Sequence, residues 1–222
     1  MNEHEAREEI CRIGKSLFDR GYVCGTAGNI SIRLAEGSGY LITPTDACLG
    51  FLDGQRLARL DANGKQVAGD RASKTMALHR QIYAAATQFD PATACVIHTH
   101  STHCVALTLS SHGDELLAAI TPYFVMKVGR VPIVAYDRPG APAVATAVAD
   151  AIRRYGERGT PIRTVMLERL GPNVWHDTPA SAMAVLEELE ETARLVNTSR
   201  EHIQPLSDAQ INDLRQTFGA RW

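Results

Sequence analysis

The spacing of apolar residues along the chain predicts four main helices. Apolar positions recur every three or four residues, as on one face of a helix, in four stretches: residues 10–18, 73–87, 141–155 and 178–197. Gly21 is expected to end the first helix, and Thr178-Pro179 has the residue types of an N-cap and first turn for the last. The glutamates of the last helix are interpreted as its solvated side: Glu187, Glu188, Glu190 and Glu191.

Shorter segments have the alternating or continuously apolar pattern of strands. They are residues 30–34, 40–42, 94–98, 132–135 and 164–167. Asp61-Ala62-Asn63-Gly64 is typical of a hairpin turn. Because strands and helices alternate along the chain, we expect a single α/β domain over residues 1–222, with helices covering both faces of its sheet.

Composition narrows the classes of partner. The chain has 222 residues, 45% hydrophobic and 22% charged, which suits one globular core. A formal charge of -2 favours neither nucleic acid nor an anionic membrane as partner. Five scattered cysteines without a Cys-x-x-Cys pair indicate reduced thiols and a cytoplasmic protein. We expect no leader, because glutamates crowd the first residues, and no apolar run reaches the length of a membrane span.

Two histidines at the end of an apolar strand are the first candidate for chemistry. Alternate side chains of a strand share a face, so His98 and His100 are expected on the same side, about 6–7 Å apart at Cβ. Two imidazoles at this separation can coordinate one divalent ion. His79 is interpreted as a helix packing residue, and four other histidines as solvated surface: His4, His112, His176 and His202.

Three polar segments are candidates for binding an anion. The Gly25-Thr26-Ala27-Gly28-Asn29 loop, Thr43-Pro44-Thr45-Asp46 after a strand, and Asp70-Arg71-Ala72-Ser73-Lys74 before a helix offer amides, hydroxyls and cations. None of them has the glycine spacing of a nucleotide-binding loop. The structural alternatives are a tight turn at the first segment and a capped helix with solvated cations at the last.

The order of these motifs resembles the class II aldolase/adducin family. The matching segments are Gly-Thr-Ala-Gly-Asn-Ile-Ser (25–31), Ile-Thr-Pro-Thr (42–45), Ser73-Lys74, Leu78-His79 with Tyr83, and Val-Ile-His-Thr-His-Ser (96–101). Ser-Thr-His-Cys (101–104), Thr-Pro-Tyr (121–123) and Leu-Glu-Glu-Leu-Glu-Glu-Thr-Ala (186–193) are most similar to the 3-oxo-tetronate 4-phosphate decarboxylase branch. The resemblance implies a three-layer α/β/α fold with a mainly antiparallel or mixed sheet, and a homotetramer with active sites between subunits.

The same resemblance implies the parts of an active site. It places the phosphate of an anionic small-molecule substrate at Thr26, Asn29, Thr45, Ser73 and Lys74. It places a divalent metal, generally zinc, on His98 and His100. Tyr123 is a candidate catalytic residue lining the pocket, and a packed core tyrosine is the structural alternative. The metal would polarise a carbonyl and a hydroxyl and stabilise an enediolate while a carbon–carbon bond breaks.

Two positions depart from the family pattern. Thr75 occupies the place of the family's glutamate, which acts as acid/base or as a metal ligand, and Leu170 occupies that of its third metal-binding histidine. Three interpretations follow. Glu168 substitutes as ligand and catalytic carboxylate, which favours iron or manganese; the metal is lost; or His103 or His176 completes the site.

The function predicted from these residues is a divergent lyase, of decarboxylase or aldolase type, for a small phosphorylated or acidic carbonyl compound. The departures at Thr75 and Leu170 count against ordinary aldolase chemistry, and the retained histidines count against a simple relic. The alternative is a repurposed member of the family. Such a member would be a non-catalytic binding or assembly protein, or an enzyme with metal-independent or iron-dependent chemistry.

Overall fold

A mixed sheet of eight strands forms the centre of the computed structural model, which describes residues 1–110 and 113–222. Its strands, in spatial order, are β4 (Gln66–Ala68), β3 (Ala58–Leu60), β2 (Tyr40–Ile42), β1 (Asn29–Arg33), β5 (Cys95–His98), β8 (Gly171–His176), β7 (Thr164–Leu167) and β6 (Ile133–Val134). Among the described strands only β6 and β7 pair in parallel. The mainly antiparallel or mixed sheet is therefore confirmed, whereas the expectation for His112 lies outside the described residues.

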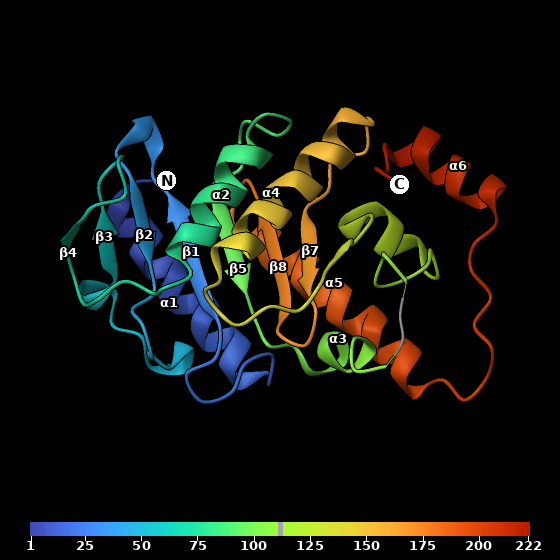
Figure 1. Cartoon of the computed structure of the whole chain (residues 1–222), viewed down its shortest axis with the longest axis horizontal. Helices are drawn as coiled ribbons and strands as arrows, with labels where there is room; N and C mark the ends of the chain where they lie inside the picture. The colour runs from blue at the N-terminus through green and yellow to red at the C-terminus, as the bar shows by residue number, and fades with distance from the viewer. Residues whose placement is uncertain (111–112) are drawn as a thin grey trace.

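Helices cover both faces of this sheet (Figure 1). They are α1 (Glu3–Asp19), α2 (Met76–Ala86), α3 (Thr102–Leu107), α4 (Pro142–Glu157), α5 (Pro179–Thr198) and α6 (Asp208–Phe218). Short 3-10 turns lie at Ala35–Gly37, Leu49–Phe51 and Gly54–Arg56, and a π-helical turn at Phe124–Val128. The three-layer α/β/α arrangement is confirmed. Within the described ranges, no helix combines the length and the apolar character needed to cross a lipid bilayer.

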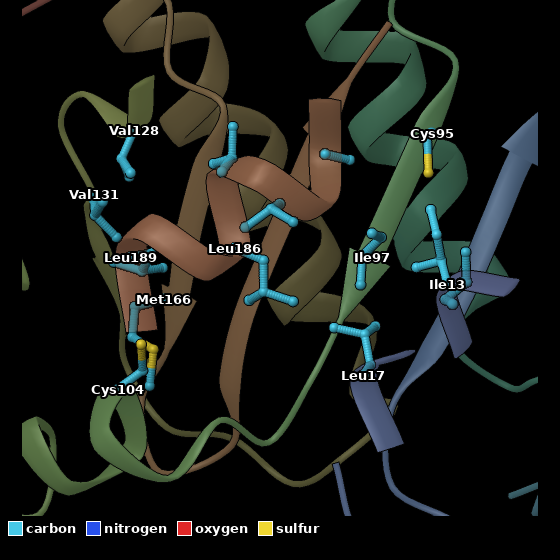
Figure 2. Close-up of a cluster of buried hydrophobic side chains, with 14 of the residues drawn as sticks. Ile13, Leu17, Cys95, Ile97, Cys104, Val128, Val131, Met166, Leu186 and Leu189 are labelled. Atoms are coloured by element: carbon cyan, nitrogen blue, oxygen red, sulfur yellow. The ribbon is translucent and has the colours of Figure 1, made fainter. Parts of the chain in front are cut away.

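The two larger apolar cores lie between the sheet and the helices on each of its faces. On one face, Ile13 and Leu17 of α1 and Leu186 of α5 pack with Cys95 and Ile97 of β5, as Figure 2 shows. On the other face, α2 and α4 pack over a second core; its members include Ile82, Val96, Val148, Ile152 and Trp175. Side chains alternate along β5, so His98 shares the α2 and α4 side with Val96.

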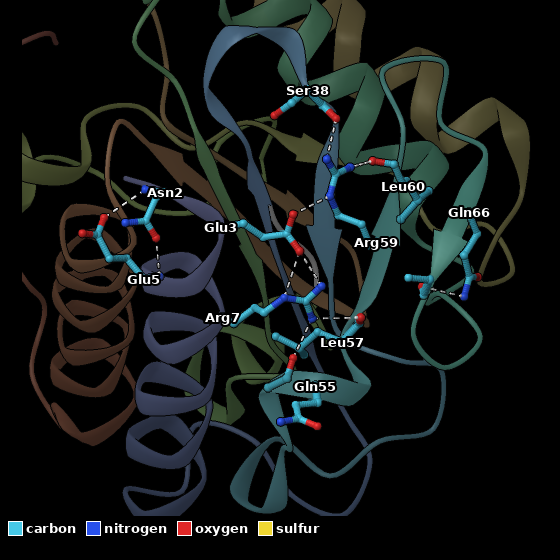
Figure 3. A network of polar contacts seen from close by, with 12 residues as sticks. Asn2, Glu3, Glu5, Arg7, Ser38, Gln55, Leu57, Arg59, Leu60 and Gln66 are labelled. Atoms are coloured by element: carbon cyan, nitrogen blue, oxygen red, sulfur yellow. Dashed lines mark hydrogen bonds and ion pairs between the residues drawn. The ribbon is translucent and has the colours of Figure 1, made fainter.

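The first helix is fixed to the edge of the sheet by charged groups. Asn2 and Glu5 form a capping box at its start. Glu3 accepts hydrogen bonds from Arg7 and Arg59 (Figure 3). The Arg7 hydrogen bond is the main cause that holds the pKa of Glu3 below its ordinary value. This network joins α1 to β3 at the end of the sheet away from β6.

One expected helix start was wrong by about one turn. The sequence pattern placed it at Ser73, but α2 begins at Met76. The Ser73 amide donates to the Thr43 carbonyl (3.2 Å), and the Ser73 hydroxyl bonds the Thr75 hydroxyl (2.9 Å). Pairing with the Thr43 segment holds residues 73–75 in a turn before the helix.

The interpretation of Glu190 as solvated was also wrong. Its side chain is 9% exposed and accepts from the backbone amides of His103 (2.8 Å) and Cys104 (3.0 Å). These are first-turn amides of α3 that have no partner within that helix. A carboxylate there stabilises the start of the helix that directly follows His100.

Candidate functional site

A cavity of about 470 Å³ brings seven of the nine expected site residues together. These are Thr26, Asn29, Thr45, Ser73, Lys74, His98 and His100. They come from the loop before β1 and its first residue, the segment after β2, the turn before α2, and the end of β5 with the residues that follow it. Thr75, Leu170 and the segment that leads into α4 complete the wall. Residues far apart in sequence therefore share one site.

The histidine pair is held in a defined orientation. The two ring centroids of His98 and His100 are 5.1 Å apart. His98 Nδ1 donates to the Pro172 carbonyl at 2.9 Å, so the Nε2 atom of the neutral ring carries the lone pair. Burial, helped by the nearby His100, lowers the pKa of His98 to about 4, and burial also lowers the pKa of His100. Both imidazoles are neutral at neutral pH.

A glycine makes this orientation possible. Gly171 has φ +127°, and a Cβ atom there would lie 2.0 Å from the Thr99 carbonyl oxygen. No side chain fits into that space, so the start of β8 approaches the end of β5 closely. The close approach brings the Pro172 carbonyl to His98.

Backbone pairing brings the segments of the expected anion site together. Thr45 N donates to the Arg71 carbonyl at 2.9 Å, so the segment after β2 runs beside the turn before α2. Asn29 is 6% exposed, and its Oδ1 is buried without a hydrogen-bond partner. Lys74 forms no ion pair with a carboxylate within residues 1–110 and 113–222. Unpaired polar groups at a cavity wall are typical of a site for a charged ligand.

The two departures lie in the same cavity as the histidines. Thr75 and Leu170 both line it, where the family resemblance expects a glutamate and a histidine. Leucine has no ligand atom. In the parts of the chain that the structure describes, no group of three or more His, Cys, Asp and Glu side chains is arranged to hold a metal ion.

None of the expected substitutes completes a metal site. β7 ends at Leu167, so Glu168 does not share a strand face with Leu170, and its carboxylate accepts from the Tyr136 amide at 2.8 Å. His176 contacts Asp177, and the Asn197 amide donates to the carbonyl of His103. The described residues supply two imidazoles at this site, one fewer than the three protein ligands of a catalytic zinc site. These residues do not fit a tightly held resident ion.

Tyr123 lies outside the cavity lining of its own chain. It is 57% exposed, and the Lys127 ammonium lies 5.4 Å from the centre of its ring. Sequence reasoning missed Arg138, which does line the cavity. The Asp137-Arg138-Pro139-Gly140 run has only the residue types of a turn, so no local signal indicated a binding role.

The sequence is similar to known proteins over nearly its whole length. Residues 8–196 match the family described as Class II Aldolase and Adducin N-terminal domain. A 3-oxo-tetronate 4-phosphate decarboxylase of Cupriavidus necator is 48% identical over 99% of both chains. The enzyme of that name from Escherichia coli K12 is 38% identical over 96% of each.

Solved structures show the same relationship. YgbL from Klebsiella pneumoniae has a TM-score of 0.86 at 39% identity, covering 97% of this chain and 100% of its own. An L-fuculose 1-phosphate aldolase has a TM-score of 0.79 at 22% identity, covering 97% of this chain and 96% of its own, which shows a shared fold.

Proposed function

Because the chain belongs to the class II aldolase and adducin family, we propose that it is a carbon–carbon lyase that decarboxylates a small phosphorylated 3-oxo acid. The observation that carries this proposal is the meeting of Asn29, Ser73, Lys74 and the two histidines in one cavity. The three polar segments of the wall suit a phosphate, and the names of the similar enzymes supply the substrate class. Decarboxylases and aldolases both break a carbon–carbon bond.

The altered residues favour decarboxylation over aldol cleavage. Aldol cleavage requires a base to remove a hydroxyl proton, and Thr75 replaces the family's acid/base glutamate. Loss of carbon dioxide from a 3-oxo acid requires no such base. The bond between C1 and C2 breaks, its electron pair forms an enolate with the C3 oxygen, and C2 then takes a proton from water. This reaction therefore tolerates the change at Thr75 better.

The remaining residues have separate parts in this reaction. Thr26, Asn29, Thr45, Ser73 and Lys74 would hold the phosphate. His100 is a neutral imidazole at the cavity wall and would donate a hydrogen bond to the developing enolate oxygen. His98 cannot donate from Nε2, because its ring proton is already on Nδ1. These residues would act without a metal ion, because the donor set does not fit one.

We expect the purified protein to release carbon dioxide from 3-oxo-tetronate 4-phosphate and to leave a phosphorylated dihydroxyacetone. The rate should exceed the spontaneous rate and should persist after chelator treatment. Cleavage of fuculose- or ribulose-type phosphates should be about 10²–10⁴-fold slower than in family aldolases, the usual contribution of an acid/base group. Coupled assays of both products measure this. Phosphate binding without any turnover would instead favour the non-catalytic alternative.

We expect Lys74→Ala to weaken phosphate binding about tenfold or more, the usual cost of a charged hydrogen bond. Inorganic phosphate should raise the melting temperature of the unaltered protein, because a ligand of the folded state stabilises it. The variant should lose most of that gain. Lys15→Ala is the matched control, since Lys15 lies on α1 and pairs with Asp19. Equal responses of the two variants would remove Lys74 from the site.

The proposal extends to the oligomeric state of the protein and to its cellular compartment. We propose a cytoplasmic homotetramer with active sites between subunits. The support is the position of Tyr123. Its side chain is exposed and is not part of the cavity lining of its own chain, so it is free to contact the cavity of a neighbouring copy. All five cysteines are free, as expected for a reducing compartment.

A further inference from the structure

We propose that Arg138 recognises the carboxylate of the substrate, the group that leaves as carbon dioxide. This inference rests on the proposed function and assigns a residue for substrate specificity. Arg138 lines the same cavity as the phosphate site and comes from a different element. It would provide a second anion-binding point for a ligand that carries both a phosphate and a carboxylate.

Arg138 lies in the segment between β6 and α4, and this segment turns at the cavity wall. The Ala141 amide donates to the Arg138 carbonyl at 3.0 Å, and Gly140 has φ +82°, so the chain turns here. α4 starts immediately afterwards and packs against α2. Figure 1 shows this segment returning across the sheet before α4 begins. The turn thus places Arg138 across from the residues before α2.

The charges of the cavity wall match a ligand with two anionic groups. Lys74 and Arg138 are its lysine and arginine, and Asp46 is the one carboxylate in the described lining. Within the described chain, neither cation forms an ion pair. Lys74 belongs to the same turn as Ser73, which is part of the proposed phosphate site. Arg138 lies in a different segment, between β6 and α4. A planar guanidinium can bind a carboxylate through two parallel hydrogen bonds.

The start of α4 adds a favourable field. The helix has 16 residues, its N-cap Ala141 provides no side-chain cap, and its first turn contains no acidic residue. Several residues of this turn line the cavity, including Ala141, Pro142 and Ala145. The positive end of a helix dipole stabilises an anion nearby. It supplements Arg138 and does not define the site by itself.

The chemistry determines which kinetic constant Arg138 controls. The carboxylate loses its negative charge as carbon dioxide forms, so an ion pair with Arg138 weakens on the way to the transition state. An interaction that is strong in the bound substrate mainly lowers KM. We therefore expect Arg138→Met to raise KM about tenfold or more with a smaller change in kcat.

Binding of two stable probes tests the assignment without turnover. 3-Phosphoglycerate carries a phosphate and a carboxylate, and glycerol 3-phosphate carries the phosphate alone. By calorimetry, the unaltered protein should bind the acid about tenfold or more tightly than the alcohol. Arg138→Met should abolish this preference and leave the affinity for glycerol 3-phosphate unchanged. Arg138→Lys should restore part of it, because the charge returns without the planar fork.

Two controls separate the possible outcomes. Arg154→Met removes one positive charge from the far end of α4, outside the cavity lining, and should keep the preference. Arg138 is exposed, so its variants should keep the melting temperature. If neither probe binds the unaltered protein, the proposed function is wrong. If both bind equally, or if the preference survives Arg138→Met, the role of Arg138 is wrong.

Discussion

The double variant Thr75→Glu/Leu170→His is expected to retain one zinc ion per chain after treatment with a chelator, whereas the unaltered protein is expected to retain none. Both positions line the cavity that holds His98 and His100. The variant would have three imidazoles and a carboxylate, which meets the ligand number of a catalytic zinc site. Loss of a residue that only supports a ligand costs about 10–100-fold in metal affinity. Adding a direct ligand should gain at least that factor.

Metal content and competition with a chromogenic chelator measure this gain. Leu170→His alone should give an intermediate affinity, and adding His98→Ala to the double variant should abolish tight binding. Thr75→Glu supplies an acid/base group in addition, so weak aldol cleavage is expected to accompany the metal. Stoichiometric zinc in the unaltered protein after chelation would contradict the account of a two-imidazole site.

Gly171→Ala is expected to have the largest effect on stability, lowering the free energy of unfolding by roughly 2–6 kcal/mol. The backbone at φ +127° strains any residue with a Cβ, and that Cβ would lie 2.0 Å from the Thr99 carbonyl oxygen. The overlap involves backbone, so a side-chain rotation cannot relieve it. Denaturant unfolding measures the loss of stability. The hydrogen bond from His98 Nδ1 to the Pro172 carbonyl should weaken at the same time.

Gly159→Ala is the matched control for this prediction. Gly159 also has positive φ (+77°), but a Cβ there would have no atom within 4 Å. The control therefore carries the backbone strain without the steric overlap, and should cost about 1–2 kcal/mol. A similar loss in both variants would show that strands β5 and β8 can separate without penalty.

Local sequence was sufficient for much of the fold and for most of the site. Helical periodicity identified the segments that became α1, α4 and α5, because amphipathic patterns depend on residues three or four apart. The alternating pattern placed β1, and the residue types of Asp61-Ala62-Asn63-Gly64 placed the turn between β3 and β4. The His98 and His100 pair was expected on one side, and both residues line the cavity.

Other features could not be derived from local pattern. The interpretation of Glu190 as solvated failed because its burial depends on α3, which lies 86 residues away in the chain. The expected reach of Glu168 failed because β7 stops one residue earlier and the Tyr136 amide binds its carboxylate. Each outcome depends on a neighbour supplied by another element.

The sequence by itself determined the three-layer fold, the histidine pair, the phosphate motifs and the two departures at Thr75 and Leu170. The histidine pair and the polar segments follow from residue type and short spacing, whereas the three-layer fold, the phosphate role and the two departures follow from the resemblance of the ordered motifs to the family. Only the tertiary structure decided that both departures share one cavity with the histidines, that no carboxylate of the described residues forms a three-ligand group with them, and that Arg138 joins the wall. The physical reason is that a ligand site depends on which side chains converge in space, and convergence is decided by strand register and by close backbone approaches such as Gly171.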